Sequence, residues 1–347
     1  MAHQSNATVW RRRPRLTLRL AGLLCIPLAA AFTWIGSEYR VARKQARSLA
    51  IAQAESVELV PCGEVWESIR RSLPDVVSRD TGGTCFSRVV GFRVPGFITD
   101  EQLAACGQFS ALKWLELAAP VESTPSGWRH LTDLRQLRRL TVDCSCCDED
   151  IVRAVLELDQ LEVLDLHVGN CGSALARLQR FNNLRELSIS FWSPYGMDDR
   201  SVELRHIRIP PNVTNLSLSI GDGEQSLGNE LDVAFTCFDR LETLHLVGAS
   251  SMYGTSVFTR NAFRLIARFV NLECLDIGRT GADDSDIDCL LALTRLRYIC
   301  LRDTRVSQYG VLTLARSLPD LTEIDHSAVC TPEVAMEIDT LLMSRRK

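Results

Sequence analysis

Cysteine and histidine are the residues of this chain that could bind a metal ion or act as nucleophile and base. The densest group is the run from Cys144 to Asp148, which contains three cysteines and one aspartate. Zinc ligands usually come in separated pairs from different turns, and the adjacent side chains of Cys146 and Cys147 cannot easily face one ion. We therefore interpret this run as the end of a strand and predict no metal site.

Covalent catalysis would need a cysteine, a base and a group that orients the base. His167 and His245 fall at polar positions near Asp165 and several cysteines, so a cysteine- and histidine-dependent enzyme is one alternative. No complete set of these groups is found locally, and the chain lacks a phosphate-binding loop, a dinucleotide fingerprint and the HExxH and GxSxG motifs. We predict that the chain is not an enzyme and uses no cofactor.

Charge is distributed unevenly along the chain. Residues 1–47 hold nine lysines and arginines and one acid, which leaves 30 basic and 42 acidic residues beyond them and a formal charge of −12 there. A surface with this bias repels phosphate backbones, so we do not expect nucleic acid as a partner. The 13 cysteines show no disulfide framework and no paired CxxC motifs.

The N-terminal segment contains an apolar run from Leu20 to Gly36 that carries no charge. Together with Leu16 to Arg19 it approaches the ~20 residues of a bilayer span, and Trp34 fits an interfacial anchor. We predict a basic tail over 1–15 and a transmembrane helix over 16–36, with a cleaved signal peptide as the alternative. Five basic residues before the run and four after it favour a single-pass membrane protein with a cytoplasmic N-terminus and the remainder outside.

The pattern L-x-x-L-x-L recurs through the rest of the chain. Ten copies begin 23 to 31 residues apart. The last two apolar residues of each copy point to one side of a short strand, and stacked neighbours bury that side in a continuous core. Helices should return the chain between strands. Thr99 and Gln102 have the spacing of a capping box, and Asp283 and Ser307 precede similar starts. The copies begin at residues 89, 112, 137, 161, 184, 213, 241, 272, 296 and 321.

The units LDIGRTGADDSDIDCLLALTRL and ICLRDTRVSQYGVLTLARSLPDL resemble the leucine-rich-repeat family, in its bacterial variety with threonine at the ninth position, here Thr280 and Thr304. The resemblance implies an α/β solenoid with a curved parallel sheet on the concave side and helices on the convex side. It covers about ten repeats over 89–326, and we expect a helical stalk and cap over 37–88 and a capping helix over 327–347. The long units over 184–271 depart from the pattern and insert loops at 191–212 and 247–263.

The third and fifth residues of each copy, with the seventh, should point away from the core onto the concave sheet. This face is polar, moderately acidic and carries a few aromatic side chains, which are frequent anchors in protein interfaces. We predict that it binds a protein or peptide ligand, although a merely solvated face with Trp114 packed under a neighbouring loop would give the same pattern. The candidate residues are Trp114, Glu116, Arg139, Thr141, Asp165, His167, Glu186, His245, Asp276 and Tyr298.

The sequence therefore favours a membrane-anchored binding scaffold. An adaptor that recruits substrates to a larger complex is an alternative, but it would need an effector module, and residues 37–88 are too short and too polar to form one. A purely structural role is compatible with the same sequence.

Overall fold

The computed structural model describes residues 14–61, 87–120, 123–144, 149–169, 173–191, 207–220, 240–247, 260–328 and 330–345. The chain divides into two compact units. The first comprises Met1–Ala50 and Leu59–Val89, and the second comprises Ile51–Glu58 and Val90–Lys347.

In the first unit, helix α1 runs from Pro14 to Ala52 and does not end with the apolar run. Its second half carries Glu38, which is 6% exposed and pairs with Arg88 at 2.8 Å. Of the residues that the structure describes, none forms a helix with both the length and the apolar character that a membrane span requires. The transmembrane helix expected over residues 16–36 was therefore wrong. The apolar run is part of a longer helix that continues through charged residues to Ala52.

The segment expected to be a helical stalk and cap, 37–88, is helical only in its first part. Residues 37–52 belong to α1, whereas Glu55–Pro61 forms strand β1. Residues 62–86, like the expected basic tail up to residue 13, lie outside the described residues.

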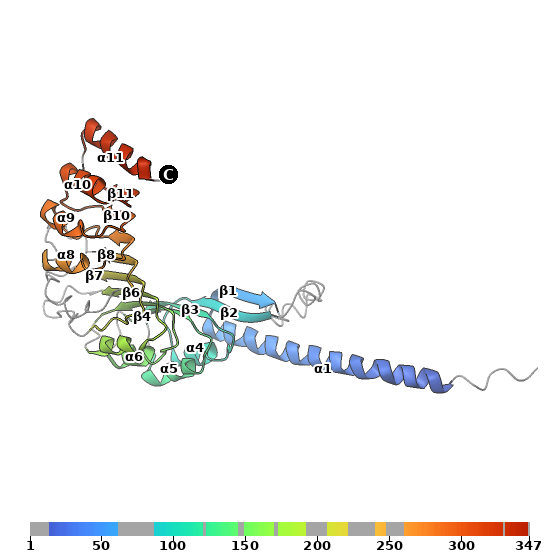
Figure 1. Cartoon of the computed structure of the whole chain (residues 1–347). Coiled ribbons are helices and arrows are strands. Elements are labelled where there is room, and N and C mark those ends of the chain that lie inside the picture. Colours follow the sequence, from blue (N-terminus) through green and yellow to red (C-terminus); the bar gives the residue numbers. More distant parts are fainter. Residues whose placement is uncertain are drawn as a thin grey trace, which may run out of the picture. The chain divides into compact units, whose positions relative to one another are not determined.

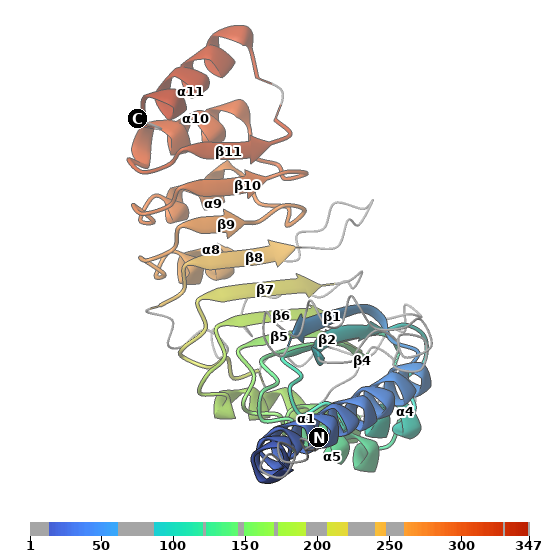
Figure 2. The same cartoon turned by 90° about the vertical axis from the view of Figure 1, so that its right-hand side faces the viewer.

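Eleven strands of the described chain form one sheet, in chain order from β1 to β11. From β2 onward each strand pairs in parallel with the next. Figures 1 and 2 show these strands stacked in sequence. The remaining strands are β2 Ser87–Val94, β3 Trp114–Pro120, β4 Arg139–Cys144, β5 Val163–Val168, β6 Glu186–Phe191, β7 Asn215–Ile220, β8 Thr243–Val247, β9 Cys274–Asp276, β10 Tyr298–Leu301 and β11 Glu323–His326.

Short helices follow most strands and form a second layer in which successive helices are neighbours. Figure 1 shows α8, α9 and α10 along one side of the strands. The α/β repeat architecture is thereby confirmed as a long parallel sheet of the kind a solenoid contains. The helices are α4 Asp100–Cys106, α5 Pro125–Thr132, α6 Glu149–Val155, the 3-10 helix η1 Ala174–Arg180, α8 Arg260–Ile266, α9 Asp284–Leu290, α10 Gln308–Ser317 and α11 Pro332–Arg345.

The leucines of the repeated pattern form the core between the two layers. Leu115, Leu140, Leu164 and Leu187 are at most 2% exposed. They lie opposite one another on consecutive strands, because Leu115 pairs with Leu140, Leu140 with Leu164 and Leu164 with Leu187. A one-residue slip would turn these side chains to solvent, so the leucine pattern sets the register of the sheet.

A backbone ladder joins the repeats just before each strand. The carbonyl of Arg138 accepts hydrogen bonds from the amides of Glu162 and Val163, at 2.7 and 2.9 Å. The carbonyl of Glu162 accepts the equivalent pair from the next repeat, at 2.9 and 3.1 Å. Each repeat thus satisfies the backbone of its successor where the chain enters the sheet.

The helix starts agree with the sequence. Thr99 and Gln102 form a reciprocal capping box at α4, and Asp283 with Asp286 forms another at α9. Ser307 accepts the amide of Tyr309 at the start of α10. These caps satisfy amides that would otherwise lack a partner in the first helical turn.

Successive helices are also joined by a side-chain contact that the sequence did not predict. Asp100 of α4 accepts the amide and the hydroxyl of Thr124, the N-cap of α5, both at 2.8 Å. Asp284 of α9 accepts the same two groups of Ser307, at 2.7 and 2.6 Å. An acid in one helical turn therefore caps the helix of the following repeat. We call this arrangement the inter-repeat clamp.

Candidate functional site

The outer face of the sheet consists of the side chains that alternate with the core residues of β2 to β11. On β4 and β6 these side chains are half-buried or exposed, whereas their neighbours are buried. Strand pairing places them in rows that cross the strands. The middle row contains Glu116, Thr141, Asp165, Ser188, Ser217, His245, Asp276, Cys300 and Asp325.

All ten candidate residues lie on this face. Five of them, Glu116, Thr141, Asp165, His245 and Asp276, belong to the middle row. Pairing brings together Trp114 with Arg139 and His245 with Asp276. The structure does not bring all ten into one site, because Trp114 on β3 and Tyr298 on β10 are seven strands apart, or about 34 Å at ~4.8 Å per strand. The candidates form a surface rather than a pocket.

The side chain of Trp114 contacts residues of the neighbouring strands β1 and β2. Its indole Nε1 donates a hydrogen bond to Glu58 of β1. Its ring also occupies the space where a Cβ at Gly91 would lie. The glycine on β2 therefore allows the indole to pack against the sheet, whereas the alternative from the sequence placed this ring under a neighbouring loop. Glu58 and Gly91 carried no signal in the repeat pattern.

The acids of the outer face differ in their partners. Glu116 pairs with Arg93 at 3.1 Å, and Asp325 pairs with Arg302 at 2.7 Å. Among the residues that the structure describes, only the imidazole of His167 lies within ion-pair distance of Asp165, at 3.9 Å. One of its carboxylate oxygens, Oδ1, is shielded from solvent and has no hydrogen-bond partner among the described residues.

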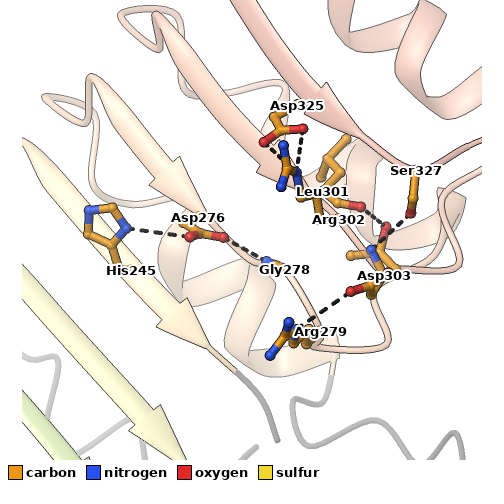
Figure 3. A network of polar contacts seen from close by, with 10 residues as sticks. His245, Asp276, Gly278, Arg279, Leu301, Arg302, Asp303, Asp325 and Ser327 are labelled. Carbon is orange, nitrogen blue, oxygen red and sulfur yellow. Dashed lines mark hydrogen bonds and ion pairs between the residues drawn. The ribbon is translucent and has the colours of Figure 1, made fainter. Parts of the chain in front are cut away.

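The polar network of β8 to β11 is shown in Figure 3. His245 Nδ1 lies 3.6 Å from Asp276 Oδ2, and the amide of Gly278 donates to Asp276 Oδ1 at 2.9 Å. Burial alone would raise the pKa of Asp276, but the nearby imidazole of His245, the hydrogen bond from the Gly278 amide and the neighbouring thiol of Cys300 outweigh it and lower that pKa. Asp276 is therefore ionised at neutral pH.

The turns after β9 and β10 hold this network in place. Arg279 and Asp303 occupy equivalent positions with φ of 61° and 55°. The hydroxyls of Thr280 and Thr304, at the ninth position of their repeats, donate to the carbonyls of Ile277 and Leu301 at 2.6 and 2.8 Å. The repeated threonine thus closes each turn and explains its place in the pattern.

The thiols and the phenol in this network favour their neutral forms. Burial raises the pKa of Cys274, and the charge of Asp276 adds to it. Burial likewise raises the pKa of Cys300. Burial, followed by the charges of Cys300, Asp325 and Asp276, raises the pKa of Tyr298 to about 12. A thiolate nucleophile needs a lowered pKa, so this environment is the opposite of an activated cysteine site.

No metal site is found among the described residues, which contain no group of three or more histidine, cysteine or acidic side chains that could hold an ion. Cys144 is a buried strand residue. The rest of the candidate cysteine run, 145–148, lies outside the described part of the chain, as do 192–206 and 248–259 of the two inserted loops.

The helix layer carries a hollow of about 350 Å³ lined by Arg129, Arg153 and Arg177, together with acids of the same helices. Arg153 pairs with Glu149 at 2.6 Å, and Arg177 with Glu157 at 3.6 Å. Two of the three arginines are thus neutralised within the layer, which makes this hollow a weaker candidate than the outer face.

Comparison with known proteins adds little to this geometry. No family model and no curated protein matches the chain. Among solved structures, a structural-genomics protein from Bacteroides fragilis is similar at 17% identity over 64% of this chain and 68% of that chain, with a TM-score of 0.40. A likeness at this level assigns no function. The repeat architecture is established by the chain's own strands and helices, and membership of the leucine-rich-repeat family stays a prediction.

Proposed function

We propose that this chain is a leucine-rich-repeat scaffold whose outer sheet face binds a protein or peptide ligand. The observation that supports this proposal is the charge of that face. It presents more carboxylates than arginines, and the half-buried side chains of its middle strands, β6 and β7, are small and polar. The carboxylates are Glu116, Asp143, Asp165, Glu186, Asp276, Glu323 and Asp325, and the arginines are Arg93, Arg139 and Arg302.

Charge complementarity of this kind favours basic ligands and increases their rate of association. The neutral thiols beside Asp276 support a binding role over a catalytic one. The rigid parallel sheet supports it too, because fixed side chains lose less entropy when a ligand binds.

The test is charge reversal on the outer face. The triple variant Glu116→Lys, Asp165→Lys and Glu186→Lys is expected to weaken binding of a fluorescein-labelled (Lys-Ser)5 peptide at least tenfold, measured by anisotropy. Unlike charges become like charges, and the peptide is repelled.

The matched control reverses three exposed acids in the turns that precede β4, β5 and β11, namely Asp133, Asp159 and Asp320. It changes net charge equally and should retain the affinity of the wild type. Equal binding by both triple variants would contradict the proposal. Circular dichroism and the single variant Glu186→Gln, which keeps the side-chain shape, separate a binding defect from misfolding.

Thiol reactivity tests the enzymatic alternative. We expect Cys106, Cys274 and Cys300 to react with iodoacetamide more slowly than free cysteine at pH 7.5, because burial raises the pKa of all three and that of Cys106 to about 12. Peptide mass spectrometry of the native protein gives the rate at each site, and urea-unfolded protein is the control. A cysteine that reacted faster in the native state would restore the enzymatic reading.

A further inference from the structure

Two acids of the middle row stand apart from the others. Glu116 and Asp325 each have an arginine partner, whereas in the described part of the chain the only basic side chain within 4 Å of Asp165 or of Asp276 is an imidazole. A histidine carries charge only when it is protonated, so it neutralises a carboxylate less completely than an arginine does. Among the described residues, no lysine or arginine forms an ion pair with either of these two aspartates.

Their surroundings limit what could neutralise them. Asp165 Oδ1 is shielded from solvent and has no hydrogen-bond partner in the described part of the chain. His167 Nε2, the nearest titratable nitrogen, is 3.9 Å from that same oxygen, which is too long for a hydrogen bond. Asp276 is held by Gly278 and His245 and has a lowered pKa. Both side chains are nevertheless partly exposed, Asp165 at 34% and Asp276 at 24%, so a cationic group from outside could reach them.

Between the two acids the middle row carries two small uncharged side chains and one imidazole. It passes from Asp165 through Ser188 and Ser217 to His245 and Asp276, one residue per strand from β5 to β9. Ser188 and Ser217 are half-buried, and neither hydroxyl has a hydrogen-bond partner among the described residues. Small hydroxyls leave room for a main chain above the sheet and can both donate to and accept from it.

The spacing of the acids sets the length of a ligand that reaches both. Four strand intervals of ~4.8 Å separate β5 from β9, or about 19 Å. An extended peptide advances ~3.3 Å per residue, so about six residues cover this distance. A single ligand can engage both acids only by crossing the strands.

We propose that the row from Asp165 to Asp276 is a docking track for an extended peptide that carries two basic side chains about six residues apart. The basic side chains pair with Asp165 and Asp276, and the peptide main chain lies over Ser188 and Ser217. This inference rests on the proposed function and adds the charge, the spacing and the direction of the ligand.

The experiment uses the full chain and fluorescein-labelled, amidated heptapeptides. The peptide Lys-Ser-Ser-Ser-Ser-Ser-Lys is compared with Lys-Lys-Ser-Ser-Ser-Ser-Ser, which has the same composition but adjacent lysines. We expect the spaced peptide to bind at least fivefold more tightly at low salt, since two exposed ion pairs form instead of one. Asp165→Asn and Asp276→Asn should each remove this preference, and the exposed control Asp159→Asn should keep it.

A steric variant tests the middle of the track independently. Ser217→Trp leaves both acids in place but fills the space between them, and it should weaken the spaced peptide more than the adjacent one. Because Ser217 lies on the outer face, the core is unchanged, and an unaltered thermal midpoint would verify that.

The outcomes separate the two proposals. If binding is lost on charge reversal at Glu186 but both lysine spacings bind equally, the track is overturned and the scaffold function stands. If no outer-face substitution changes binding, both are overturned. If spermine, which has spaced cations but no peptide groups, competes as strongly as the spaced peptide, the assignment of a peptide ligand is overturned.

Discussion

Replacing Leu164 by alanine is expected to lower the free energy of unfolding by about 3–5 kcal/mol, the range for a fully buried leucine whose cavity cannot collapse. Leu164 is 0% exposed and lies between Leu140 and Leu187 on the neighbouring strands. The lost side chain removes contacts on both sides at once, and the backbone ladder on both flanks limits relaxation. Urea denaturation followed by circular dichroism gives the change.

Val163 is the matched control because it precedes Leu164 on β5 but points to the outer face, where it is half-buried. Val163→Ala should cost about 1 kcal/mol or less, mainly through lower strand propensity and partial burial. Similar losses at the two positions would show that the alternation of core and outer face is wrong. The proposal that the outer face binds a ligand would then be contradicted as well.

Gly127→Ala is expected to destabilise the protein by about 2 kcal/mol, although alanine is normally the better helix former by about 1 kcal/mol. A Cβ at Gly127 would lie 2.2 Å from Asp100 Oδ1, inside the inter-repeat clamp. The carboxylate must then move and lose its hydrogen bonds to Thr124. A surface hydrogen bond of this kind contributes about 1 kcal/mol.

The sign of this effect should reverse when the clamp is absent. Asp100→Ala alone should cost about 1 kcal/mol, and adding Gly127→Ala to that variant should be neutral or stabilising by up to about 1 kcal/mol. Leu103 Cδ1, at 3.2 Å from the new Cβ, has the freedom to adjust. A double-mutant cycle by thermal and urea denaturation measures the coupling. Additive effects would mean that Asp100 and Gly127 act independently.

The clamp recurs with variation along the helix layer. Asp284 and Gly310 repeat the relation of Asp100 and Gly127, with Gly310 again too close to the aspartate for a Cβ. Glu149 accepts the hydroxyl of Ser173 at 2.8 Å, and this hydrogen bond, followed by that from Arg153, lowers the pKa of Glu149. A glycine three residues after the capping threonine or serine is therefore the mark of an aspartate clamp.

Much of the repeat fold could be predicted from the sequence because one local rule repeats. Each L-x-x-L-x-L copy buries the same residues, so Leu115 to Leu187 align without any knowledge of long-range contacts. The capping box of Thr99 and Gln102 is equally local, since both residues belong to one helical turn. The positions of the outer-face residues follow from the same alternation.

The prediction of a transmembrane helix was wrong because it rested on the apolar run alone. In the structure this run is part of α1, which continues through charged residues to Ala52 and buries Glu38 against Arg88, and no described helix is long and apolar enough to span a membrane. The helical pattern after residue 52 likewise gave way to strand β1, because sheet pairing can override local propensity.

By itself, the sequence determined the repeated strand and helix, the buried leucines and the side of the sheet on which each polar residue lies. Side chains alternate between the two faces of a strand every second residue, and the strands recur once per repeat, so both patterns can be read locally. Only the tertiary structure decided which acids find an arginine, that the indole of Trp114 reaches Glu58, and that Asp100 caps the next helix. Those contacts join residues 23 to 56 positions apart, and they depend on side-chain reach across neighbouring repeats, which no local pattern encodes.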